Sequence, residues 1–192
     1  MNAVIAPECF QTKDAVALAP WLLGKVLVRS RAGGIVSRHV ITETEAYNGE
    51  KDLASHASKG RTARTEVMYR PGGVWYVYLC YGVHEMLNLV VGPEGFPAAV
   101  LIRGLHDVSG PGRLTKRLGI GRAMNGRPAI ERTGLHLEDD GFDVPKKWIQ
   151  RTPRIGVDYA GPVWSKKLWR FTIDPQWPGL ASLQPRQARR QR

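Results

Sequence analysis

Two glutamates stand two residues apart in a segment whose side chains would alternate between the two faces of a strand. Residues 40–47 read Val-Ile-Thr-Glu-Thr-Glu-Ala-Tyr. Successive side chains of an extended strand point to opposite faces, so we expect Ile41, Glu43, Glu45 and Tyr47 to share one face. Paired carboxylates beside an aromatic ring suit general acid–base chemistry, and a solvated or ion-paired polar strand face is the alternative.

Aromatic side chains gather in the same half of the chain. Trp75, Tyr76, Tyr78 and Tyr81 lie in one apolar run, and Tyr47 ends the segment with the carboxylates. In a basic protein such rings favour stacking against unpaired nucleobases, although core packing is the ordinary alternative for any single ring. Tyr81 immediately precedes a glycine, so we expect its ring to protrude where a strand ends.

The charge of the chain favours a polyanionic partner. Lys and Arg number 28 against 17 Asp and Glu, which gives a net charge of +11. That balance suits DNA, RNA or an anionic membrane surface. Candidate phosphate contacts are Arg61 and Arg64 in a basic run, and Arg113 and Lys116 on a predicted helix whose N-terminus also suits a phosphate. A solvated charged face is the alternative for each run.

Length and composition exclude several classes of protein. With 192 residues, 43% of them hydrophobic, the chain suits one domain. No run is apolar enough to span a bilayer, no basic and apolar leader opens the chain, and its two cysteines form no disulfide framework. We therefore expect a cytoplasmic protein with free thiols and no membrane association.

Motifs for metals and nucleotide cofactors are incomplete. The pair His84-Glu85 lacks the second histidine of a zinc-protease helix, and the chain has no Cys-x-x-Cys. Two Gly-x-Gly sequences, at 110–112 and 119–121, lack the third glycine of a dinucleotide-binding loop. The sequence therefore predicts neither a metal nor a cofactor.

Strands must hold the carboxylates and the rings in place. Glycines and prolines punctuate short apolar runs, which predicts strands at 25–29, 35–47, 74–81, 86–91, 98–105, 135–138 and 170–173. Helical pieces are expected at 14–24, broken near Pro20, and at 110–119, with a long ordered loop and a short helix at 50–70. Close succession of the central strands predicts antiparallel pairing.

An ordered series of motifs runs through the chain: Glu43-Thr-Glu45-Ala-Tyr47, Ser55-His56-Ala, Gly60-Arg-Thr, Met68, Pro71-Gly, Tyr76-Val-Tyr78, Tyr81-Gly82, Asn88, Leu101-Ile-Arg103, Gly110-Pro-Gly and Arg154-Ile-Gly156. From about residue 22 to residue 171, this series resembles the alkyladenine, or methylpurine, DNA glycosylase family. The first block and the tyrosine blocks are its most specific parts. The chain departs from the family at Thr65-Glu66, where members carry an asparagine after the arginine.

The resemblance implies a fold and an activity. The expected fold is α+β, a single compact domain with a curved, largely antiparallel β-sheet flanked by short helices, like that of methylpurine DNA glycosylases and of the C-terminal domain of formyltransferases. It would cover residues 1–184, followed by a basic, disordered tail at 185–192. The implied activity is that of a monofunctional DNA glycosylase, which flips a damaged purine out of duplex DNA and hydrolyses its N-glycosidic bond. Double-stranded DNA is then the partner, and we expect a monomer because no exposed apolar stripe is apparent.

For catalysis, the family pattern points to Glu45, which would deprotonate the attacking water. Arg103 and the backbone carbonyl of Ile155 would hold that water. A departing purine leaves an oxocarbenium-like sugar that a carboxylate stabilises, and Arg103 would keep the carboxylate ionised, which makes Glu43 the less suitable catalyst. A base made cationic by alkylation leaves without a proton donor, whereas neutral lesions need an acid that the sequence does not identify.

For recognition of the base, the family pattern points to five further residues. Tyr47, His56 and Tyr78 would line the base pocket. Tyr81 would fill the gap that the flipped nucleotide leaves in the duplex, and Asn88 would exclude the 2-amino group of normal guanine.

Two other classes of protein stay open. A non-catalytic lesion-binding protein would use the same pocket, although it would not need Glu45 and Arg103. A metal-dependent nuclease would use Glu43, Glu45, Asp52 and His56. The sequence does not rank 3-methyladenine, 7-methylguanine, hypoxanthine and ethenoadenine as substrates, because that preference depends on the shape of the pocket.

Overall fold

Strands and short helices alternate along the chain, and the computed structural model describes residues 3–11 and 14–183. The strands are β1 (Ala3–Val4), β2 (Val26–Ser30), β3 (Val36–Asn48), β4 (Trp75–Cys80), β5 (His84–Val90), β6 (Ala98–Leu105), β7 (Val108–Ser109), β8 (Leu135–Asp139), β9 (Ile149–Thr152) and β10 (Arg170–Ile173). The α-helices are α1 (Ala15–Trp21), α2 (Pro111–Leu118) and α3 (Gly161–Trp164).

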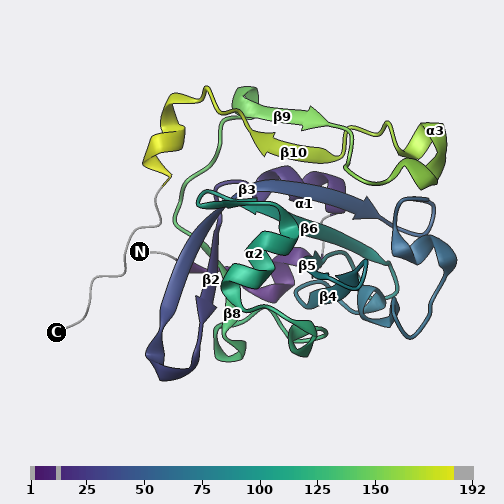
Figure 1. The fold of residues 1–192 in the computed structure, drawn as a ribbon, viewed down its shortest axis with the longest axis horizontal. Coiled ribbons are helices and arrows are strands. Elements are labelled where there is room, and N and C mark those ends of the chain that lie inside the picture. The colour runs from purple at the N-terminus through teal and green to yellow at the C-terminus, as the bar shows by residue number, and fades with distance from the viewer. Residues whose placement is uncertain (1–2, 12–13, 184–192) are drawn as a thin grey trace.

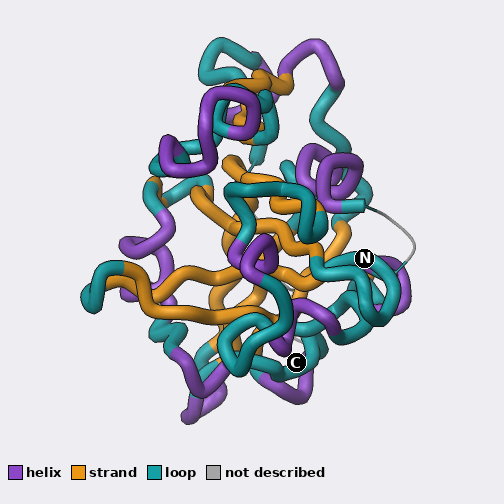
Figure 2. The backbone as a smooth tube through the Cα atoms, turned by 90° about the vertical axis from the view of Figure 1, so that its right-hand side faces the viewer, coloured by secondary structure: helices purple, strands orange, loops and turns teal. Residues whose placement is uncertain are grey.

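The strands of this described part form one antiparallel sheet (Figure 1). Its order is β1-β8-β2-β3-β6-β5-β4, while β10 pairs with both β3 and β9, and β7 pairs with β6. Figure 2 shows the strands gathered in the middle of the molecule, with helices and loops around them. The predicted α+β domain with a largely antiparallel sheet is confirmed.

The central strands lie where the sequence predicts them, within two residues at each end. Strand β9 is missing from the prediction. Its residues 149–152 read Ile-Gln-Arg-Thr, which holds a single apolar side chain and therefore no alternation to detect. It forms because it pairs with β10, residue 149 opposite residue 173, so tertiary pairing rather than local pattern makes it a strand.

The first helix ends close to Pro20, as predicted. Helix α1 includes Pro20 in its last turn and ends at Trp21, and a turn then leads to Gly24, whose φ is +86°. Asp14 caps the start by accepting a hydrogen bond from the backbone N–H of Ala17 at 2.7 Å. The helix packs against β3 and β6, and that packing outweighs the loss of one backbone hydrogen bond.

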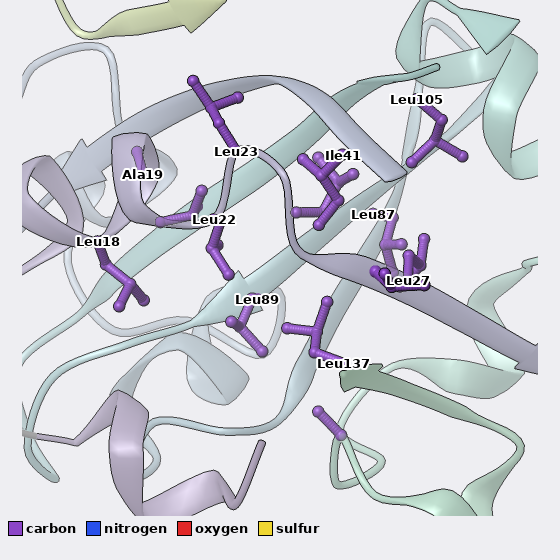
Figure 3. Packing of buried hydrophobic residues seen from close by; sticks show 14 of the residues in the cluster. Leu18, Ala19, Leu22, Leu23, Leu27, Ile41, Leu87, Leu89, Leu105 and Leu137 are labelled. Atoms are coloured by element: carbon purple, nitrogen blue, oxygen red, sulfur yellow. The ribbon is translucent and has the colours of Figure 1, made fainter. Parts of the chain in front are cut away.

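A double irregularity in β3 sets which residues face the core. The pairing of β3 with β6 shifts between Ile41 and Glu43 and again between Glu43 and Thr44. Ile41 is therefore fully buried in the main hydrophobic cluster (Figure 3), so the prediction that it shares a face with Glu43 is wrong. An extra residue in a strand reverses the alternation beyond it, and this is why a strict period of two fails here.

The sheet has a core face and a face that lines a cavity. On β6, Val100 and Ile102 belong to the main hydrophobic cluster, whereas Leu101 and Arg103 line the cavity. Strands β4 and β5 alternate in the same way, and Asn88 of β5 is on the cavity side. Short-range alternation thus positions the side chains of the site.

The remaining predictions concern the loops and termini. The segment 50–70 contains two 3-10 helices, His56–Lys59 and Glu66–Tyr69, where one short helix is predicted. Helix α2 is confirmed and ends at Gly119, whose left-handed conformation (φ +60°) is typical of a helix C-terminus. The predicted tail at 185–192 lies outside the described residues. Among those residues, no helix has the length and apolarity needed to cross a membrane.

Candidate active site

One cavity collects most of the residues that the sequence singles out. Its volume is about 810 Å³, and its walls come from β3 to β6 and from the loops around residues 53–68 and 155–159. Its lining includes the predicted residues Glu45, Tyr47, His56, Arg64, Tyr78, Tyr81, Asn88, Arg103 and Ile155. Arg61, Arg113 and Lys116 do not line it.

Glu45 is the buried acid of this cavity. Its side chain is fully buried, Oε1 accepts a hydrogen bond from the backbone N–H of Ile155 at 2.9 Å, and Oε2 accepts one from the Tyr47 hydroxyl at 2.9 Å. Burial raises the pKa of Glu45, and the charge of Arg103 lowers it to a smaller extent. The effect of Arg103 has the predicted direction, since it favours the ionised carboxylate, but the loss of solvation is the larger effect.

Ile155 contacts Glu45 through its backbone N–H. The prediction assigns its carbonyl to the attacking water, and that role stays a prediction. The hydrogen bond from the Ile155 N–H to Glu45 is a contact that the sequence does not reveal, since residues 45 and 155 are 110 positions apart. It stabilises the ionised form of the carboxylate and fixes the orientation of its plane.

A buried ion pair holds the loop that carries Ile155. Arg154 donates two hydrogen bonds to Asp52, at 2.6 and 2.8 Å, and neither side chain is exposed. Arg154 also donates to the carbonyl of Ala46 at 2.8 Å, and its guanidinium lies 4.9 Å from the centre of the Tyr47 ring. This pair ties the loops before His56 and around Ile155 to β3.

The position of Asp52 removes the support for the nuclease alternative. That reading requires Asp52 beside Glu43, Glu45 and His56, but its carboxylate is committed to Arg154. Among the described residues, no group of three or more His, Cys, Asp and Glu side chains is arranged to hold a metal ion. Asp52 is thus a structural residue that sequence spacing misassigns.

His56 is part of the aromatic wall of the cavity and contacts both tyrosines of β4. The rings of His56 and Tyr78 meet edge to face at 4.5 Å, and Nδ1 of His56 lies 3.0 Å from the Tyr76 hydroxyl. Burial, with a smaller effect of Arg64, lowers the pKa of His56 to about 4, so the imidazole is neutral at physiological pH. Arg64 lies 3.5 Å from Nε2 and 5.2 Å from the centre of the Tyr78 ring. Because the Arg64 guanidinium can only donate to Nε2, the matching neutral tautomer has its hydrogen on Nδ1, which donates a hydrogen bond to the Tyr76 hydroxyl oxygen.

Sequence reasoning does not place Tyr76 among the pocket residues, although its alternation with Tyr78 contains the signal. Residues 76 and 78 stand two apart on β4 and therefore share a face. The amide nitrogen of Asn88 donates to the carbonyls of Tyr76 at 3.2 Å and Met86 at 3.4 Å. Asn88 is thereby held in a single orientation at the cavity wall.

Tyr81 protrudes from the turn between β4 and β5. Its side chain is 90% exposed, and it is the one non-glycine residue of the described chain with a positive φ, +50°. Gly82 follows with φ +70°, and the Val83 N–H donates to the Cys80 carbonyl at 3.1 Å. Two successive positive φ angles are typical of a type I′ turn, which favours Asn-Gly over Tyr-Gly. The turn therefore keeps a strained residue whose ring points into solvent.

Tyr81→Asn should separate stability from activity. We expect the variant to gain up to about 1 kcal/mol of unfolding free energy, because asparagine tolerates the left-handed conformation. If Tyr81 fills the gap that a flipped nucleotide leaves in a duplex, as the family resemblance implies, release of bases from duplex DNA should fall. Thermal melting and single-turnover excision measure the two effects. Tyr81→Phe is the matched control, since it keeps both the ring and the strained left-handed backbone. A Tyr81→Asn protein that melts at a lower temperature than wild type would show that the turn does not strain residue 81.

The four candidate backbone contacts differ in their surroundings. Arg61 is exposed but bound by Glu66 through two contacts of 2.7 Å, so the departure at Thr65-Glu66 places a carboxylate on one of the predicted phosphate ligands. Arg113 and Lys116 are exposed on α2. The structure thus leaves these two open to a polyanion, while Arg61 would have to exchange its partner.

The fold and the site together define a class of protein. A basic α+β protein with a buried carboxylate in an aromatic cavity has the features of an enzyme that acts on unstacked nucleobases. The sequence profile of the methylpurine-DNA glycosylase family matches residues 9–109 and 106–176. The chain therefore belongs to the methylpurine-DNA glycosylase family.

Individual relatives agree with this assignment. A protein of Myxococcus xanthus named as a candidate 3-methyladenine DNA glycosylase is 47% identical over 178 residues, which cover 87% of this chain and 89% of the relative. A DNA-3-methyladenine glycosylase of Arabidopsis thaliana is 42% identical over 195 residues, which cover 91% of this chain and 73% of the relative. The predicted class, a DNA glycosylase that hydrolyses an N-glycosidic bond in base excision repair, is confirmed.

Proposed function

We propose that this protein is a monofunctional glycosylase that flips damaged purines out of duplex DNA and releases them with Glu45 as the general base. The observation that carries the proposal is the fully buried Glu45 carboxylate, which lines the aromatic cavity and is oriented by Ile155 and Tyr47. The same hydrogen bonds leave each carboxylate oxygen a further lone pair for a water molecule. A protein that only binds lesions has no need for such a group.

The chemistry divides between the carboxylate and the rings. Ionised Glu45 takes a proton from the water molecule that attacks the sugar. The negative charge of Glu45 also stabilises the oxocarbenium-like transition state. Arg103 and the carbonyl of Ile155 hold the water. Tyr47 and Tyr78 offer electron-rich faces to a base made cationic by alkylation, and such a base departs without an acid.

The neutral His56 bears on lesion preference. With a pKa of about 4 it carries no acidic proton at neutral pH, so it serves as a wall and hydrogen-bond partner of the pocket rather than as a general acid. Cationic lesions such as 3-methyladenine and 7-methylguanine are then favoured over hypoxanthine, whose departure needs protonation. Asn88 excludes the 2-amino group of intact guanine.

The interaction with DNA completes the proposal. Tyr81 fills the gap in the duplex, and Arg64, Arg113 and Lys116 contact phosphates, with Arg61 joining them once it leaves Glu66. Residues 1–184 act as one domain and the protein works as a monomer. It is cytoplasmic and associates with the nucleoid through its positive charge.

The pH dependence of excision tests the role of Glu45. The general base must be ionised, and burial raises its pKa above the ordinary value of 4.5. The single-turnover rate should therefore fall as the pH drops through that raised pKa, with a midpoint above 4.5. Rates with one duplex oligonucleotide over a range of pH measure this acid limb; a rate that stays level through the ordinary glutamate pKa would contradict it.

Base release is the direct test of the function. Duplex oligonucleotides with 7-methylguanine, hypoxanthine or ethenoadenine are incubated with excess protein in EDTA, and alkali is added afterwards to cut abasic sites. We expect free base, with strand breaks only after alkali. Tight binding without release would favour a lesion-binding protein, and strand breaks before alkali would overturn the monofunctional mechanism.

A further inference from the structure

Arg103 lies between two carboxylates and contacts them unequally. Its Nε is 2.8 Å from Oε1 of Glu43 but 3.6 Å from Oε1 of Glu45. All three side chains are largely or fully buried, with exposed fractions of 15%, 12% and 0% for Arg103, Glu43 and Glu45. The cation nearest the proposed base therefore lies closer to the other acid, at ion-pair distance although its Nε makes no hydrogen bond among the described residues.

Glu43 is itself fixed from the opposite side. Nε of Arg170 donates to Oε1 of Glu43 at 2.6 Å, and Nη1 of Arg170 donates to the Thr152 hydroxyl at 3.0 Å. Arg103 is on β6 and Arg170 on β10, and both strands pair with β3. One carboxylate thus bridges two cations across three neighbouring strands.

The backbone makes room for this arrangement. The shifts in pairing around Glu43 place it opposite Gly104 of β6. A Cβ at position 104 would lie 3.0 Å from Cβ and 3.2 Å from Oε2 of Glu43. A larger residue at 104 would therefore press on Glu43, so the double irregularity of β3 and Gly104 together give Glu43 its place beside Arg103.

We propose that Glu43 is a positioning residue that holds Arg103 back from a close ion pair with Glu45. The inference rests on the proposed role of Glu45 as the general base. If Arg103 closed on Glu45, it would occupy a carboxylate lone pair that the attacking water needs, and the carboxylate would become a weaker base. Glu43 and Arg170 keep the arginine close enough to hold water and too far to neutralise the base.

The charged and titratable groups around Glu45 determine in which direction its pKa moves when Glu43 loses its charge. They are Glu43 and Tyr47 from β3, Arg103 from β6 and the N–H of Ile155, while Tyr78 of β4 and Arg154 act on Tyr47. Of these, Arg103, Ile155 and Tyr47 lower the pKa of Glu45, and Glu43 raises it. Removing the charge of Glu43 therefore lowers the pKa of Glu45 and frees Arg103 to approach it.

The test compares wild type with Glu43→Gln, which keeps the shape of the side chain. We expect single-turnover excision at neutral pH to fall about tenfold or more, the acid limb of the pH profile to move to lower pH, and affinity for lesion-containing duplex to stay the same. Glu138→Gln is the matched control, because it also removes a buried carboxylate paired with an arginine, Arg38, outside the cavity. It should leave the acid limb unchanged.

A second readout does not depend on activity. Titration of the Glu45 side-chain carboxyl by ¹³C NMR should give a lower midpoint in Glu43→Gln than in wild type. An unchanged midpoint would overturn the inference, as would an equal loss of rate at every pH. Failure of the proposed function is recognised separately, because Glu45→Gln would then excise as fast as wild type whatever Glu43 does.

Discussion

Glu45→Gln should abolish excision while leaving the fold and DNA binding intact. Glutamine keeps both hydrogen bonds of the site, because its carbonyl accepts from the Ile155 N–H and its amide donates to the Tyr47 oxygen. It carries no charge to take a proton from water or to stabilise the sugar cation. We expect the single-turnover rate to fall by about 10²- to 10⁴-fold, the range for removal of a general base.

The measurement is base release under single turnover, with the affinity for lesion-containing duplex determined alongside. Glu94→Gln, on the loop between β5 and β6 and outside the cavity, is the control for loss of one negative charge. A Glu45→Gln protein that retains most of its rate would refute the assignment of the base. Loss of rate together with loss of DNA binding would show that the substitution disturbs lesion binding rather than the chemical step.

Asp52→Asn should destabilise the protein more than any surface substitution. The change leaves the fully buried Arg154 without its ionic partner and turns an amide towards its N–H groups. Breaking a buried ion pair by removing one partner costs about 3–5 kcal/mol, because the remaining charge stays in a poorly solvating interior. For a domain of this size that lowers Tm by about 6–20 °C.

Thermal or urea unfolding measures this loss, and Glu66→Gln is the matched control. Glu66 also pairs with an arginine through two contacts, but the pair is exposed and its loss should change Tm little. Because Arg154 precedes Ile155, the folded fraction of Asp52→Asn should also excise more slowly. Equal melting temperatures for the two variants would show that the buried pair does not hold the loop.

The local features of the site follow from short stretches of sequence. Alternation on β3 places Glu45 and Tyr47 on one face, and a tyrosine before a glycine predicts the exposed Tyr81. The same pattern reveals the central strands, since apolar residues at every second position leave few other ways to bury them. The basic balance points to a polyanion, and the motif series points to the family to which the chain belongs.

Tertiary structure decided the features that join distant segments. Asp52 pairs with Arg154 rather than with the other acids, Ile155 donates its N–H to Glu45, and Arg103 favours Glu43 over Glu45. These contacts connect residues that lie on different strands and loops, up to 110 positions apart, and no periodicity encodes them.

The sequence by itself determined which residue types the site contains and that Glu45 and Tyr47 share a strand face, because alternation is a property of neighbouring residues. Tertiary structure decided their electrostatics. Burial, and not Arg103, has the larger effect on the pKa of Glu45, and the shift in pairing around Glu43 that brings Arg103 and Arg170 together exists only once β3 lies between β6 and β10. Solvation and charge pairing depend on the whole packed molecule, so they cannot be assigned until the distant segments have met.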